Sequence, residues 1–163
     1  VCQAWEAEYG SLSSLAKRMV IMRIGVVLST QGGALKEMMK TNGIGIYGYF
    51  GNGKSYYPWI HIDDICAIVE QSILSNEYRG IINTVSTNPA TIKTLIKAIK
   101  KAKQGIGIVA PIPEPLLKLV LGEMHTMITD SAKVHPDALL ALEHDFHFDN
   151  PVEAINDLLI RKV

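Results

Sequence analysis

The sequence lacks the features that mark a charged, cross-linked or membrane-spanning protein. Its 163 residues carry 16 basic and 16 acidic side chains, so the formal net charge is zero and we expect no attraction to nucleic acid or to an anionic membrane. The two cysteines, Cys2 and Cys66, form neither a disulfide framework nor a metal-binding spacing, which fits a reducing, cytoplasmic setting. No apolar run approaches the roughly 18 residues that a membrane-spanning helix needs.

The start of the sequence also lacks the parts of a secretory signal peptide. Residues 1–6 have neither a basic beginning nor an apolar middle, and the first residue is Val1 rather than methionine. The sequence therefore begins inside a segment with helical spacing. We expect the chain to be a fragment, or to be cut from a longer chain.

What the sequence does contain is apolar material in alternating strand and helix patterns. Hydrophobic residues make up 48% and charged residues 20% of the chain, which is typical of a folded domain with a sizeable core. Apolar, β-branched or aromatic runs predict strands at residues 19–28, 56–62, 80–85 and 106–110. Helical spacing predicts helices at residues 5–18 and 34–40, and after the caps Asp63-Asp64 and Thr91. This order predicts an α/β fold.

Prolines at 111, 113 and 115 predict a boundary between two parts of the chain, because proline interrupts a sheet ladder. We assign residues 1–110 to the sheet and residues 111–163 to a small, mainly helical domain. Helices are expected at residues 116–121, from Pro136, and from Asn150, where Pro151 and Glu153 complete a strong start pattern. In the helix after Asp64, the predicted buried stripe is Ile65, Ile68, Val69 and Ile73.

Two glycine patterns imitate nucleotide-binding loops. Gly48-x-x-x-x-Gly53-Lys54-Ser55 has the letters of a phosphate loop, and Gly43-x-Gly45-x-x-Gly48 has those of a dinucleotide fingerprint. Both motifs require a helix directly afterwards, whereas the aromatic residues 56–59 favour a strand. We interpret the segment as a flexible loop that enters a hairpin, and we keep a phosphate-loop NTPase as an alternative.

The histidines allow more than one interpretation. On a strand, Trp59, His61 and Asp63 share one face. Trp59 and His61 could line a substrate cleft, or His61 could contact a nearby carboxylate or carbonyl while Asp63-Asp64 cap a helix. His144 and His147 lie three residues apart without a third ligand nearby, so no metal site is predicted.

Several segments together resemble one family. They are Arg23-Ile-Gly-Val-Val-Leu28, Gly32-Gly-Ala-Leu-Lys36, Tyr57-Pro-Trp-Ile-His-Ile-Asp-Asp64, Asn83-x-Val-Ser-x-x-Pro89, Val134-x-Pro136-x-x-Leu139 and Phe146-x-Phe148. In this order they resemble the nucleoside-diphosphate-sugar epimerase-like branch of the extended short-chain dehydrogenase/reductases. The resemblance implies the C-terminal part of an extended Rossmann-type fold with a small C-terminal domain. It also implies NAD(P) as the cofactor of the intact protein, which would move a hydride to or from a hydroxyl or carbonyl carbon.

The resemblance also shows what is missing. The family carries a glycine loop after its first strand and a catalytic Tyr-x-x-x-Lys pair. No such first strand with its loop precedes these segments, and no tyrosine has a lysine four residues later. We therefore predict no catalytic residue in this chain, no oxidoreductase activity of the chain alone, and no tight binding of NAD(P) by it.

The resemblance implies substrate-cleft roles for Arg23, Trp59 and His61, with an unknown small-molecule substrate. Related epimerases often hold the substrate diphosphate with an arginine, at the position that Tyr57 takes here, and Lys54 is the nearest cation. A different class of function is a stand-alone binding or self-associating module. An incomplete sheet leaves an exposed edge, which would favour a homodimer.

Overall fold

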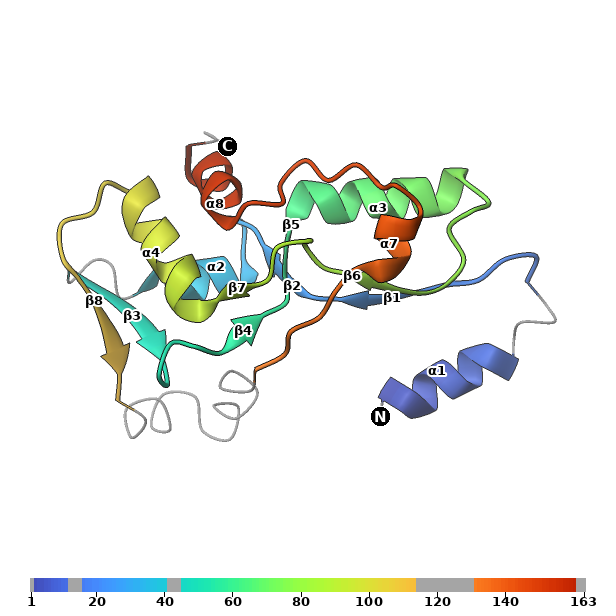
Figure 1. The fold of residues 1–163 in the computed structure, drawn as a ribbon, viewed down its shortest axis with the longest axis horizontal. Coiled ribbons are helices and arrows are strands. Elements are labelled where there is room, and N and C mark those ends of the chain that lie inside the picture. Colours follow the sequence, from blue (N-terminus) through green and yellow to red (C-terminus); the bar gives the residue numbers. More distant parts are fainter. Residues whose placement is uncertain (1, 12–15, 41–44, 114–130, 161–163) are drawn as a thin grey trace.

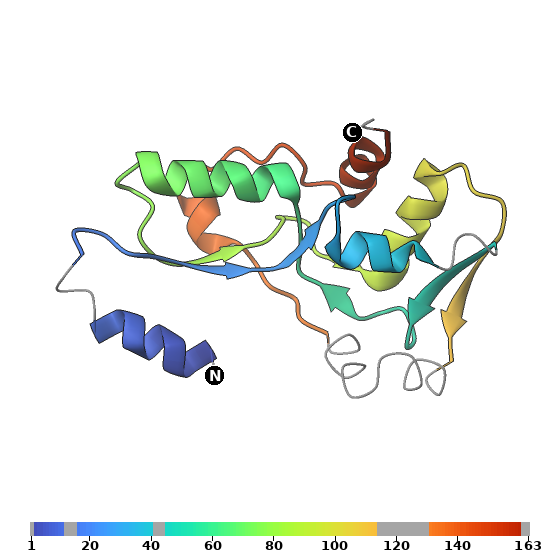
Figure 2. The ribbon, with the colours of Figure 1, turned by 180° about the vertical axis from the view of Figure 1, so that it is seen from behind.

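The computed structural model describes residues 2–11, 16–40, 45–113 and 131–160, and it confirms the predicted α/β fold (Figure 1). Strands β1 (Val20–Ile24) and β6 (Gly80–Thr84) form a parallel pair. Helix α3 (Ile62–Leu74) lies on one side of this pair, and helix α1 (Cys2–Ser11) lies on the other (Figures 1 and 2). Such coverage by helices on both faces is typical of parallel sheets.

Three further strand pairs extend away from β1 and β6. Strand β2 (Val26–Leu28) pairs in parallel with β5 (Trp59–His61), and β3 (Ile46–Phe50) pairs in parallel with β8 (Ile108–Ile112). The short strands β4 (Tyr56–Tyr57) and β7 (Ala90–Thr91) are antiparallel. Most of the described pairs are therefore parallel, as expected when helices connect successive strands.

The predicted strand at residues 19–28 is interrupted at Gly25, where it changes partner. The backbone N–H of Gly25 still donates to the Thr84 carbonyl at 3.1 Å, whereas the N–H of Val26 donates to the Pro58 carbonyl at 2.7 Å. A Cβ atom on Gly25 would lie 2.2 Å from the Pro58 oxygen and 2.8 Å from a methyl carbon of Val85. No side chain fits this space, so glycine allows the three backbone segments to meet.

Helix starts were predicted with mixed success. Thr91 caps α4 (Ile92–Ala102) by accepting from the Thr94 N–H, and Asn150 accepts from the Val152 N–H at the start of α8 (Pro151–Ile160), which confirms both predictions. The predicted cap of α3 was wrong, because His61 is the capping residue and Asp63-Asp64 lie in the first turn. An imidazole nitrogen accepts the hydrogen bond that a carboxylate usually takes.

Two apolar clusters form the described core. One packs α2 (Gly33–Met38), α4 and α8 together with strands β2 to β5, and the other packs α3 and α7 (Asp137–Ala141) on β5 and β6. The predicted stripe of α3 was only half right. Ile65 and Ile68 are buried, but Val69 and Ile73 are 40% and 70% exposed. The described helices include none that is long and apolar enough to cross a bilayer.

The glycine-rich segment is a strand followed by a turn, so the prediction of a flexible loop and hairpin was wrong. Strand β3 pairs with β8, and β4 pairs with β7. At the start of this pair, Gly107 lets β8 approach the backbone of Gly45, because a Cβ atom on Gly107 would lie 2.1 Å from the Gly45 oxygen.

The same geometry excludes the nucleotide-loop interpretations. Strand β4, not a helix, follows Ser55. The spacing Gly45-x-x-Gly48-x-x-Gly51 also has the letters of the family's cofactor loop. Its glycines lie at the start of β3, within it and in the turn after it, where no helix N-terminus can hold a pyrophosphate.

Strand β8 continues through Pro111, which was expected to end it. Pro111 lies opposite Tyr49 in the parallel register. Within the described sheet β8 is an edge strand, where proline is tolerated because its missing N–H can face outward. The division at residue 110 stays a prediction, and the helix predicted at residues 116–121 lies outside the described residues.

Substitution of Gly25 tests the strand crossing. We expect Gly25→Ala to lower the free energy of unfolding by about 1–3 kcal/mol, because the new methyl group displaces the Pro58 backbone. The matched control is Gly32→Ala, since a Cβ atom there meets nothing within 4 Å. Urea denaturation followed by circular dichroism would measure both, and equal midpoints for the two variants would contradict the proposed crowding.

Candidate functional site

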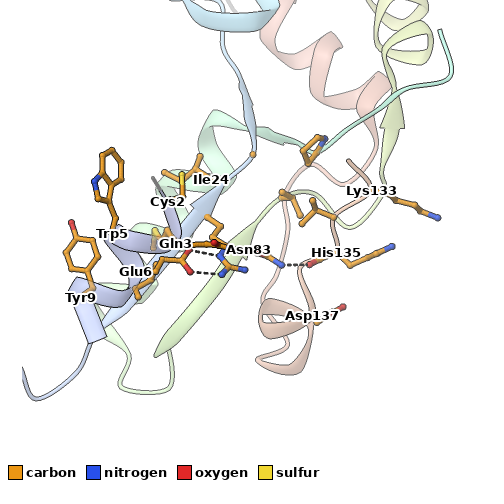
Figure 3. A pocket seen from close by; sticks show the side chains of 17 residues that line it. Cys2, Gln3, Trp5, Glu6, Tyr9, Ile24, Asn83, Lys133, His135 and Asp137 are labelled. Carbon is orange, nitrogen blue, oxygen red and sulfur yellow. Dashed lines mark hydrogen bonds and ion pairs between the residues drawn. The ribbon is translucent and has the colours of Figure 1, made fainter. Parts of the chain in front are cut away.

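A pocket of about 1000 Å³ lies against the β1–β6 pair, close to the carboxyl ends of both strands (Figure 3). Helix α1 forms one wall and the segment before α7 forms another. Gly25 and Pro58 close the end where β1 meets β2. The lining residues are Cys2, Gln3, Trp5, Glu6, Tyr9, Ile21, Met22, Arg23, Ile24, Gly25, Pro58, Asn83, Val85, Lys133, Val134, His135 and Asp137.

An ion pair between Arg23 and Glu6 joins β1 to α1 inside this pocket (Figure 3). The Arg23 Nε donates to Glu6 Oε1 at 2.8 Å and Nη2 donates to Oε2 at 2.6 Å, so the guanidinium binds both carboxylate oxygens. The hydrogen bonds lower the pKa of Glu6 and raise that of Arg23. Both groups are therefore charged at neutral pH, and Arg23 holds a carboxylate in the geometry it would use for a substrate anion.

The opposite wall is attached to β6 by Asn83, whose side-chain amide donates to the His135 carbonyl at 3.2 Å. Asn83 is also the register partner of Arg23. The side chains of Lys133 and His135 are exposed beside this contact. The pocket thus combines an apolar floor with cationic and hydrogen-bonding groups, which is the usual composition of a small-molecule site.

The structure places the predicted cleft residues in different surroundings. Arg23 lines the pocket, whereas Trp59 is 1% exposed and donates its indole N–H to the Asn88 carbonyl at 2.9 Å. Tyr57 is also in the core, and burial raises its pKa to about 12. Lys54 is exposed on the turn after β3. Their roles toward a substrate stay predictions.

His61 is fully buried and occupies a polar contact between α3 and α8. Its Nδ1 accepts from the Asp63 N–H at 3.1 Å, so the ring proton lies on Nε2, which is 3.4 Å from a carboxylate oxygen of Asp157. The ring stacks on Phe148 with centroids 4.0 Å apart. His61, Asp63 and Asp157 bring one ligand atom each within 4.8 Å of one another, but the imidazole already binds the backbone through Nδ1.

Asp64 is a second polar anchor, and the sequence interpretation assigned it only a capping role. Its carboxylate is fully buried and accepts from the backbone N–H groups of His147 and Phe148, at 2.8 and 3.2 Å. The His147 ring nitrogen lies 3.3 Å away. Asp64 therefore fastens the segment before α8 to α3. The sequence shows only two adjacent aspartates at a helix start, and it does not show that the second of them is buried.

His144 belongs to a different contact from His147. Its Nδ1 lies 2.7 Å from the Tyr78 hydroxyl. Burial, and secondarily the charge of Glu77, raises the pKa of Tyr78, so the phenol keeps its proton at neutral pH. The two histidines thus have separate partners and do not converge on one ligand position.

Comparisons with known proteins agree with this architecture. Residues 112–158 match a domain family described as a domain of unknown function, DUF1731. The epimerase family protein SDR39U1 of Mus musculus is 30% identical over 155 residues, which are 95% of this chain and 53% of the mouse protein. The chain spans about half the length of the curated relatives that it matches.

Two solved structures are also similar. The human epimerase family protein SDR39U1 (isoform 2), solved with NADPH, has a TM-score of 0.80 at 29% identity and covers 87% of this chain and 48% of its own. A nucleoside-diphosphate sugar epimerase from Corynebacterium glutamicum has a TM-score of 0.74 at 28% identity, over 97% of this chain and 30% of its own. Together these likenesses show an epimerase-like family and a Rossmann-type fold.

The contact of His144 predicts a pH dependence of stability. Burial lowers its pKa below the ordinary 6.5, and His147 acts in the same direction, while Asp64 and Asp145 oppose it. The unfolded chain then binds this proton more readily than the folded chain does. The contribution of neutral His144 to the free energy of unfolding is therefore fully present above about pH 6.5 and is lost as the pH falls through the lower folded-state pKa of His144.

Urea midpoints between pH 5 and pH 8 would measure this loss. We expect His144→Gln to flatten the profile, and we expect the exposed control His135→Gln to keep the wild-type profile. A wild-type slope that persists in His144→Gln would assign the pH dependence to other groups.

Proposed function

We propose that this chain, which belongs to the epimerase-like short-chain dehydrogenase/reductases, forms the substrate-side half of an NAD(P)-dependent oxidoreductase of the epimerase or dehydratase kind. The observation that carries this proposal is the pocket at the carboxyl ends of β1 and β6. Ligands of open parallel sheets bind at that edge. The solved human relative that shares this fold holds NADPH, which supports the same cofactor class here.

The residues of the pocket fit the nicotinamide ring of such a cofactor better than they fit its pyrophosphate. Ile24 and Pro58 offer an apolar surface for a flat ring. The described residues hold no glycine loop at a helix start, so the pyrophosphate would need another part of the protein. A bound nicotinamide would supply the hydride chemistry, while this chain would orient the substrate beside it.

Arg23 is the group in this pocket that would position an anionic or strongly polar substrate. Its guanidinium already binds a carboxylate through two nitrogens, so it would exchange Glu6 for a substrate group of similar geometry. Lys133 also lines the pocket, but its ammonium lies over the Tyr56 ring, 5.5 Å from the ring centroid. The acid–base pair that the family resemblance implies would come from outside this chain.

A cytoplasmic location is part of this proposal. Cys2 and Cys66 are both free and exposed, as a reducing compartment permits.

A fusion protein tests the cofactor assignment. It would join the half of the mouse relative that is not matched here to this chain. We expect the fusion to enhance NADPH fluorescence in a saturable titration, and we expect the chain alone to give no steady NADPH oxidation with a panel of carbonyl compounds. Steady turnover by the chain alone would overturn the assignment of the catalytic pair to the other half.

Matched variants of the fusion locate the bound cofactor. We expect Ile24→Glu to weaken NADPH binding by about tenfold, because a carboxylate at the apolar floor repels a phosphate-bearing ligand. The control Ile108→Glu places the same charge on β8, where the isoleucine is also exposed and lies outside the pocket. Equal losses in both variants would place NADPH elsewhere.

A further inference from the structure

Basic side chains are distributed unevenly along this chain, although its formal net charge is zero. Residues 78–113 contain six basic side chains and no acidic one. Net charge alone predicts no attraction to an anionic membrane, but attraction at contact depends on the local distribution of charge. Five of the six basic side chains lie on helix α4 or directly after it, namely Lys93, Lys97, Lys100, Lys101 and Lys103.

The charge of this lysine row is not compensated within the described part of the chain. Lys93, Lys97 and Lys101 follow one another at a spacing of four residues, at which like charges on a helix repel each other. The ion pairs of the described residues involve none of these lysines. The helix dipole favours Lys100 and Lys101 in the last turn, but it disfavours Lys93 in the first. The row is therefore available to an anionic partner.

The loop from α4 to β8 turns an isoleucine outward beside these lysines. Ile106 is 96% exposed. The glycines on both sides of it lie against β3 and the residue before it. A Cβ atom on Gly105 would lie 1.6 Å from the Tyr47 hydroxyl oxygen, and one on Gly107 would lie 2.1 Å from the Gly45 oxygen. Because both neighbours are held against the protein, the side chain of Ile106 points to solvent.

Two further exposed isoleucines lie at the same end of the molecule. Ile46 and Ile108 are register partners at the starts of β3 and β8, and they are 38% and 64% exposed. The Lys100 ammonium donates to the Gly107 carbonyl at 2.6 Å, which places the end of α4 beside these strand starts. Figure 1 shows this region far from α1 and β1. We call it the α4–β8 end, and it comprises Ile46, Lys97, Lys100, Lys101, Lys103, Ile106 and Ile108.

We propose that the α4–β8 end binds the surface of a bilayer that contains anionic lipid. Lysine ammonium groups near such a surface are attracted to its headgroups, and a protruding apolar side chain can enter the boundary between headgroups and acyl chains. The lysines supply the first interaction and Ile106 supplies the second. The pocket lies at the other end of the molecule, so this inference is independent of the proposed function.

An acidic protein or a nucleic acid fits this surface less well. Protein interfaces are enriched in tyrosine, tryptophan and arginine and depleted of lysine, whereas the α4–β8 end has lysine as its only cation and includes no aromatic residue. Duplex nucleic acid offers polar contacts, and single strands stack on aromatic side chains. Exposed isoleucines match neither of these, and they do match the apolar boundary of a bilayer.

Sedimentation with lipid vesicles tests the proposal. We expect the chain to sediment with vesicles of phosphatidylcholine that contain about one-third phosphatidylserine, and to remain in solution with vesicles of phosphatidylcholine alone. We also expect added salt to release the chain, because salt screens exposed charges.

One pair of variants tests the lysines. We expect Lys101→Gln combined with Lys103→Gln to weaken vesicle binding by about tenfold or more, because each lysine near an anionic surface contributes about fivefold. The matched control combines Lys17→Gln with Arg79→Gln, which removes two exposed cations just before β1 and β6. This control should change vesicle binding by less than about twofold.

A second pair tests the apolar contact. We expect Ile106→Ser to weaken vesicle binding by about fivefold or more, because the serine gains little from the acyl boundary. The control Ile73→Ser replaces an isoleucine of α3 that is 70% exposed, and it should change binding by less than about twofold. Urea midpoints equal to that of the wild type would show that both variants remain folded.

Absence of binding to the phosphatidylserine vesicles would overturn the proposal, and so would equal losses in the variants and their controls. Tighter binding to a DNA duplex than to the vesicles, unaffected by Ile106→Ser, would assign the lysines to a nucleic acid. The same result with polyglutamate would assign them to an acidic protein.

Discussion

The close approach at Gly25 is the constraint on which the rest of the structure depends. The carbonyl of Pro58 occupies the place of a side chain, so one continuous strand can leave β6 and join β5 within a single residue. Because β5 leads directly into α3, this crossing sets where His61 and Asp64 begin the helix. It also closes one end of the pocket. An added side chain at Gly25 would press against backbone atoms, which cannot move aside by changing a rotamer. The requirement for glycine is therefore strict at this position.

The buried polar groups at the start of α3 extend this constraint to the C-terminal segment. Asp64 accepts two backbone N–H groups from residues 147 and 148, and His61 faces Asp157 on α8. A hydrogen bond to a charged group contributes about 1.5–3 kcal/mol, and a buried carboxylate without its donors would cost more than that. The segment held this way includes α7, which packs on β6 beside the wall of the pocket. The shape of the pocket therefore depends on contacts that lie outside it.

Sequence patterns predicted the elements better than their partners. Residues 19–28 were recognised as a strand from their apolar, β-branched composition, but composition does not record that Gly25 lies under a carbonyl. The stripe of α3 was extended to Val69 and Ile73 because helical spacing groups them with Ile65, whereas burial depends on where neighbouring elements end. In the site, Arg23 was found and Glu6 was missed, because an ion pair between a helix and a strand leaves no spacing pattern in the sequence.

The resemblance and the pocket carry different kinds of information. The most specific family segment, residues 57–64, supplies Tyr57, Trp59 and His61, and all three side chains lie in the core. Buried residues of this kind identify the fold to which a chain belongs, and one fold can serve many reactions. The groups free to meet a substrate lie at the carboxyl ends of β1 and β6 and on the segment before α7, which other family segments supply, and on α1, which none of the family segments covers. The substrate must therefore be sought through the chemistry of Arg23 and its neighbours, and the family segment instead explains why those neighbours are held in place.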